Sequence, residues 1–149
     1  MQITKENVEQ HLGEYLESIR KAEKIEMSIT ELRYKLIPSG IDNSKTKVMS
    51  SYQDRTSAII AEIEQLQNML DMEKQKSEKL KKRTYEEIIK AIPDKKIYYR
   101  KVLVLRYLHG KNISDIANTL GYTDRHILRM KKFALDHIVE IYSKATEEG

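Results

Sequence analysis

The sequence predicts an all-α fold: a long, coiled-coil-like N-terminal helical hairpin followed by a C-terminal helix-turn-helix domain. Three observations predict it. The 149 residues include only five glycines and two prolines, and 34% of them are charged, a composition typical of long amphipathic helices. Apolar residues recur at three- and four-residue spacing over most of the chain. Near the C-terminus, Gly121 separates two short helical patterns.

The first helical pattern covers residues 4 to about 36. Its apolar side chains recur every seven residues from Val8 to Leu36, with further apolar residues between them. This spacing is typical of a helix that packs lengthwise on a partner. Pro38 interrupts the pattern, so we expect residues 37–47 to form a connecting loop.

A second long helix is expected to start near Ser50 or Ser51, because either side chain can cap the free amides of a first turn. Apolar residues with helical spacing come before and after an almost wholly polar stretch, residues 71–83. No helix breaker occurs before Pro93, so the helix can continue to that residue. Two such helices predict an antiparallel coiled-coil hairpin, or a bundle shared with a second subunit. We therefore assign residues 1–92 to a hairpin that serves oligomerisation.

From Pro93 onward the helical patterns become shorter, and residues 93–149 form the second predicted domain. Asp94 can cap its first helix, Gly110 can end that helix, and Thr123 can cap the last one. The predicted helices cover residues 94–109, 113–120 and 124–142.

The last two of these helices have the residue spacing of a helix-turn-helix. Ala117 is small enough for a place where two helices cross steeply. Gly121 follows four positions later, where a tight turn requires a positive φ. A purely structural helical hairpin could match the same spacing. The predicted core of the motif consists of Ile116, Ala117, Leu120, Gly121, Tyr122, Ile127 and Met130.

Positive charge is concentrated around this motif. Residues 95–137 contain ten Lys or Arg and only three Asp or Glu, a net charge of +7, whereas residues 1–94 are nearly neutral. A basic module of this size attracts polyanions, and the release of counterions from phosphates is the usual source of non-specific nucleic-acid affinity. A lysine-rich solvated face is the alternative interpretation.

The predicted last helix presents a basic face near its start when its apolar side chains point inward. Arg125 and Arg129 are four residues apart, hence on one side, and arginine is the usual bidentate reader of guanine. Lys131 and Lys132 are more suited to phosphates. A solvated Arg125 paired with a nearby aspartate is the alternative. The predicted DNA-binding residues are Thr123, Asp124, Arg125, His126, Arg129, Lys131 and Lys132.

Beyond residue 133 the same helix is apolar on two sides. Ile138 continues the inner stripe, whereas Leu128, Leu135 and Val139 belong to a second stripe. A helix with two apolar sides needs two partners. One is the helix-turn-helix core; the other is the N-terminal hairpin or a second subunit, and we expect burial within the chain.

The run YYRKVLVLRYLHGKNISDIANTLGYTDRHILRMKKFAL resembles the fourth region of bacterial sigma factors and, more closely, phage-encoded RinA/ArpU-type transcriptional regulators. The resemblance implies sequence-specific binding of double-stranded DNA and control of phage or prophage late or packaging genes. The residues that carry it are Arg106-Tyr107, Ile116-Ala117, Tyr122 to Arg125, Ala134-Leu135 and, outside the run, the loop Pro38-Ser39-Gly40.

Two other functions stay open at this point. A small-terminase-like DNA-packaging subunit also combines a helix-turn-helix with oligomerising helices. A coiled-coil adaptor could instead bind bacterial RNA polymerase through the C-terminal module. The expected partners are double-stranded DNA, further copies of the chain in a homodimer or larger homo-oligomer, and, as a further candidate, the polymerase.

Motifs for catalysis and metal binding are not found in the sequence. It has no cysteine, no phosphate-binding glycine loop and no ligand-like spacing among the histidines at positions 11, 109, 126 and 137. We therefore expect no metal, no cofactor and no enzymatic activity. Because no apolar run could span a bilayer or serve as a signal peptide, we expect a cytoplasmic protein. The resemblance implies that the cytoplasm is that of a bacterial host cell and that the protein is associated with the nucleoid.

Overall fold

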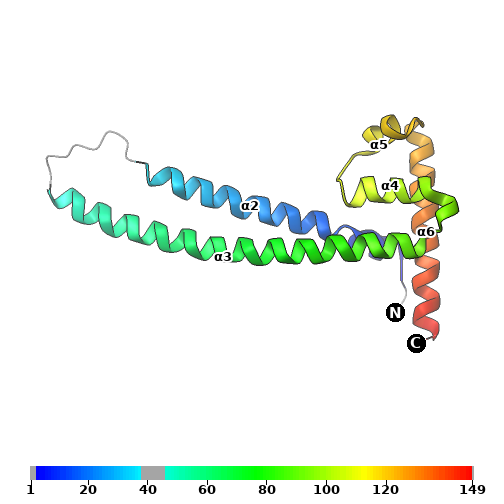
Figure 1. The fold of residues 1–149 in the computed structure, drawn as a ribbon, viewed down its shortest axis with the longest axis horizontal. Helices are drawn as coiled ribbons and strands as arrows, with labels where there is room; N and C mark the ends of the chain where they lie inside the picture. Colours follow the sequence, from blue (N-terminus) through cyan, green and yellow to red (C-terminus); the bar gives the residue numbers. More distant parts are fainter. Residues whose placement is uncertain (1–2, 38–45, 149) are drawn as a thin grey trace. The chain divides into compact units, whose positions relative to one another are not determined.

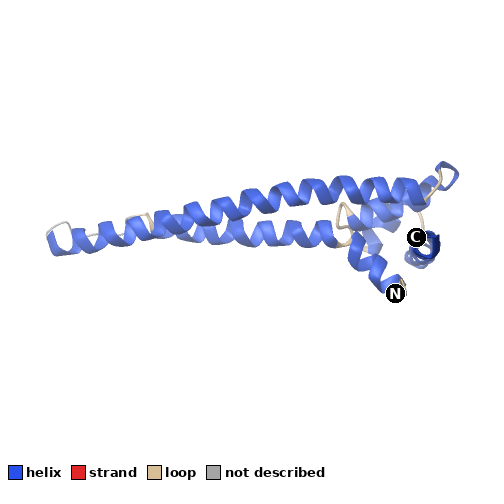
Figure 2. Cartoon of the chain, turned by 90° about the horizontal axis from the view of Figure 1, so that it is seen from below, coloured by secondary structure: helices blue, strands red, loops and turns tan. Residues whose placement is uncertain are grey.

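A computed structural model gives the structure of the chain and describes residues 3–37 and 46–148. All regular elements of these residues are helical, and none of them is a strand (Figure 1 and Figure 2). The fold is therefore all-α, as predicted. Most of the predicted loop, including Pro38-Ser39-Gly40, lies outside the described residues. The elements are α1 (Lys5–Leu12), α2 (Glu14–Lys35), α3 (Thr46–Ala91), the 3₁₀ helix η1 (Asp94–Lys96), α4 (Ile97–Tyr107), α5 (Ile113–Leu120) and α6 (Asp124–Glu148).

The first predicted helix is interrupted at Gly13, which separates α1 from α2. Thr4 and Asn7 form a capping box at the start of α1, and the Gly13 N–H donates to the Glu9 carbonyl over 2.9 Å at its end. Glycine is a poor helix former because it has the most backbone freedom to lose. The prediction of one continuous helix was wrong at this residue.

The chain divides into two compact units, residues 18–76 and residues 1–17 with 77–149. Helix α3 begins at Thr46, several residues before the predicted start at Ser50 or Ser51, and its 46 residues contribute to both units. This division differs from the boundary at residue 93 that the sequence suggests. The units reflect packing, whereas the boundary at residue 93 rests on charge and helix length, and it stays a prediction.

In the unit of residues 18–76, α2 and α3 run antiparallel (Figure 1). Ala22 and Ile29 of α2 form an apolar cluster with Leu70 of α3. The pair also buries a polar contact, in which the Ser18 hydroxyl donates to the Glu73 carboxylate over 2.7 Å. Since a buried hydroxyl must find a partner, this bond favours one register of the two helices.

In the other unit, α1 and the end of α3 share a core with α4 and α6. Leu135 and Ile138, one from each apolar stripe of α6, are both fully buried in this core, so both stripes are covered there within the chain, as expected. Leu128 is the exception, because half of its surface stays exposed. The buried members of this cluster are Val8, Leu12, Ile88, Ala91, Ile92, Leu103, Tyr107, Ala134, Leu135 and Ile138.

Helix α4 starts differently from the prediction. Asp94 belongs to η1 and does not cap α4; its carboxylate forms an ion pair with Arg100 at 2.6 Å. The Arg100 guanidinium also donates to the carbonyls of Ile89 and Ile92, which α3 and its end leave free. After α4, Gly110 has a φ of +66° and turns the chain toward α5, as expected of a stop signal.

Candidate nucleic-acid interface

The candidate site is built on the tight turn between α5 and α6. The Asn112 side chain caps α5 by accepting from the Asp115 N–H over 2.8 Å. The helix ends at Gly121, whose φ of +76° lies in the left-handed region and whose N–H donates to the Ala117 carbonyl. Glycine adopts this conformation without strain, so the chain can reverse direction within three residues before α6 begins.

Below this turn, α5 and α6 enclose a small apolar cluster together with α4. Ile116, Ala117, Ile127 and Met130 are buried in it around Val102. These four were predicted as core residues, and their burial confirms that part of the prediction. Leu120 is half-buried at the edge of the cluster.

Tyr122 differs from the prediction because it is not a core residue. Its side chain is 38% exposed. Its ring lies on the outer surface after the reversal at Gly121, 4.7 Å from the His126 ring and 6.1 Å from the Tyr98 ring. The prediction placed Tyr122 inside because it treated apolar spacing as continuous through the turn.

Replacing Gly121 by alanine should lower the free energy of unfolding by about 1–2 kcal/mol, because an L side chain is strained at this positive φ. The cause would be the backbone alone, since nothing lies within 4 Å of the added Cβ. Gly121→Asn should lose less, because asparagine tolerates the left-handed region. Urea unfolding followed by circular dichroism measures both losses, and equal losses would contradict this explanation.

The first turn of α6 is held by two side-chain hydrogen bonds. The Thr123 hydroxyl accepts from the His126 N–H over 3.2 Å, which confirms the predicted cap. The Asp124 carboxylate accepts from the Ser114 hydroxyl of α5 over 2.9 Å. Asp124 therefore joins the two helices and adds a negative charge at the N-terminus of α6, where the helix dipole favours it.

Three basic side chains of α6 are exposed on one side of the helix, and we call them the exposed face of α6: Arg125, Arg129 and Lys132. Within the described part of the chain, none of the three is in an ion pair. The predicted alternative for Arg125, a pair with a nearby aspartate, is thus not what the structure has. These cations are open to an anionic partner and are carried by a helix whose opposite side is buried.

Lys131 points to another side of the helix. Its ammonium group lies 3.4 Å from the Glu9 carboxylate of α1, and its side chain is only 19% exposed. Tyr107 lines the same part of the surface, and burial, reinforced by the charge of Glu9, raises the pKa of its phenol well above the usual value. Lys131 would have to leave Glu9 to reach a phosphate, unlike the exposed Lys132.

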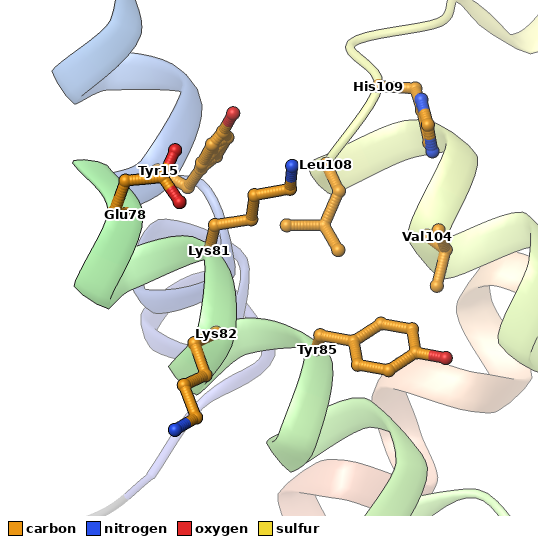
Figure 3. Close-up of a pocket in the computed structure, with 8 residues that line it drawn as sticks. All are labelled: Tyr15, Glu78, Lys81, Lys82, Tyr85, Val104, Leu108 and His109. Carbon is orange, nitrogen blue, oxygen red and sulfur yellow. The ribbon is translucent and has the colours of Figure 1, made fainter. Parts of the chain in front are cut away.

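A cleft of about 520 Å³ lies elsewhere in the same unit (Figure 3). In Figure 3 the Tyr85 side chain of α3 and the Leu108 side chain at the end of α4 extend into the gap between these helices. The Lys81 ammonium group extends toward Leu108, whereas that of Lys82 points away from the gap (Figure 3). The cleft does not include the exposed face of α6. The lining residues are Tyr15, Glu78, Lys81, Lys82, Tyr85, Val104, Leu108 and His109.

Among residues 3–37 and 46–148, no three histidine or acidic side chains are grouped as metal ligands would be. None of the helices described for these ranges combines the length and the apolar character needed to cross a bilayer. Comparisons of the chain with protein-family models, curated proteins and solved structures found no match.

Proposed function

We propose that the chain is a transcriptional regulator that binds specific sequences of double-stranded DNA. In this proposal α5, Gly121 and the start of α6 form a helix-turn-helix, and α6 is the recognition helix that enters the major groove. The observation that carries the proposal is the exposed face of α6, which presents Arg125, Arg129 and Lys132. This face belongs to a pair of helices that share a buried apolar cluster and are joined by a turn with a left-handed glycine.

The chemistry of this face favours duplex DNA as the partner. The N-terminal turns of a recognition helix are the part that reaches base edges in the major groove. Arg125 and Arg129 are one turn apart and unpaired among the described residues, so each guanidinium is available to O6 and N7 of a guanine. Lys132, one turn beyond Arg129 on the same face, suits a phosphate, which fixes position without reading sequence.

The long helices have a separate role in the proposal. We infer that α2 and α3 form the predicted hairpin and join copies of the chain into a dimer or larger oligomer, which would present more than one α6 to the DNA. The resemblance to RinA/ArpU-type regulators supports late-gene control in a phage or prophage, within the bacterial cytoplasm. The proposed activity is binding and involves no catalytic step.

Selection from a library of randomised duplexes with the full chain tests this function. We expect a shared sequence to be enriched. The double variant R125E/R129E should enrich none, because it reverses the charge of the exposed face. K79E/K90E on α3 is the matched control: both lysines are exposed, and the change in net charge is the same. Circular dichroism checks that each variant remains helical.

Two results would contradict the proposal. One is that the wild-type chain binds no duplex in the selection, even at low salt concentration. Co-purification of RNA polymerase together with that failure would favour the adaptor function. The other is equal enrichment by the wild type and by R125E/R129E, because binding would then depend on a different surface.

A further inference from the structure

Two lysines, Lys96 at the end of η1 and Lys101 in α4, lie over aromatic rings of α4 and α6. The Lys96 ammonium group is 4.6 Å from the centre of the Phe133 ring and 5.7 Å from that of Tyr99. The Lys101 ammonium group is 5.2 Å from the centre of the Tyr98 ring. Both side chains are exposed, so the rings orient the two cations without removing them from solvent.

Ring contacts connect these lysines to the exposed face of α6. Tyr98 meets Tyr122 edge to face at 6.1 Å, and the Tyr122 ring lies 4.7 Å from His126 on the first turn of α6. Phe133, below Lys96, comes one helical turn after Arg129 and so lies on a neighbouring part of the same side. The lysines therefore border the face at one edge.

The opposite edge of α6 has the reverse charge arrangement. There α1 contributes Glu9, which pairs with Lys131, and Glu6 lines the same surface pocket. Two cations, Arg106 and Lys131, thus lie beside two carboxylates on the α1 edge. On the α4 edge the Asp94 carboxylate already pairs with Arg100 at 2.6 Å. Neither Lys96 nor Lys101 on that edge is in an ion pair among the described residues.

We propose that Lys96 and Lys101 form a second phosphate-binding site, which holds one DNA strand where it leaves the groove occupied by α6. The site takes phosphodiester groups of the backbone and reads no bases. It rests on the proposed function, because it extends the same interface. It also fixes an orientation: the contacted backbone runs past the start of α4, and the α1 edge stays free of phosphate.

Salt dependence tests the site, because each neutralised phosphate contributes about 0.9 to the slope of log K against log salt concentration. The probes are a duplex enriched by the wild-type chain and a duplex of random sequence. For K96Q/K101Q we expect the slope to become shallower by about 0.9 for each lysine removed, with the affinity for both duplexes falling by the same factor. The double variant K96R/K101R should keep the wild-type slope.

The matched control is K79Q/K90Q, which removes two exposed lysines of α3 and should leave the slope unchanged. An unchanged slope for K96Q/K101Q, or a loss confined to the enriched duplex, would overturn this inference while leaving the proposed function intact. A wild-type chain that binds neither duplex would instead show that the proposed function has failed. Thermal melting followed by circular dichroism separates a loss of binding from a loss of folding.

Discussion

Replacing Arg129 by alanine should weaken binding to an enriched DNA site by about 1–3 kcal/mol and change binding to a random duplex much less. The reason is the position of Arg129 on the exposed face of α6, one turn after Arg125. A guanidinium that makes two hydrogen bonds to a guanine loses both when truncated, and a random sequence seldom offers that guanine at the right place.

Fluorescence anisotropy with the two duplexes measures these losses. K132A is the matched control, since Lys132 lies on the same face but is assigned to a phosphate. It should weaken both duplexes to a similar extent. An equal loss on both duplexes for R129A would refute its role in reading bases.

Replacing Ile116 by alanine should lower the free energy of unfolding by about 2–5 kcal/mol. Ile116 has no exposed surface and lies in the cluster that joins α5 to α6, next to Ala117 and Ile127. The substitution removes three carbon atoms and leaves a cavity between the packed helices.

Urea unfolding of the full chain followed by circular dichroism gives this free energy. N118A is the control on the same helix: Asn118 is exposed, so its replacement should change stability by less than about 0.5 kcal/mol. If I116A and N118A proved equally stable, the cluster below the turn would not be what holds α5 against α6.

The sequence was most informative where structure depends on nearby residues. The bounds of α5, the left-handed conformation of Gly121 and the cap by Thr123 all follow from spacing within about ten residues, and all were predicted. Burial of Ile116 and Ile127 follows from the same local pattern, because both lie on the faces that the two helices turn toward each other.

Features that depend on distant parts of the chain could not be predicted in this way. Lys131 was grouped with Lys132 because the two are adjacent, but α1 brings Glu9 to one of them only. The division into units has the same origin, since α1 and the end of α3 share a core with α6. Periodicity identifies an apolar face but does not identify the helix that will cover it.

The lysines on the α4 edge were missed for a related reason. Charge counts included Lys96 and Lys101 in the basic region, but their position beside α6 depends on contacts between rings far apart in sequence. A cluster of tyrosines at 98 and 99 next to lysines was the available signal. It indicates an aromatic surface without showing which helix that surface meets.

Methylation interference on an enriched duplex tests most directly whether α6 reads bases in the major groove. Methylation at N7 of guanine blocks an acceptor to which a bidentate arginine donates in the major groove. We expect methylation of at least one guanine to prevent binding by the wild-type chain, and that guanine to lose its effect in R129A. Interference that is the same in both proteins, or none at any guanine, would contradict the assignment of α6 as a recognition helix.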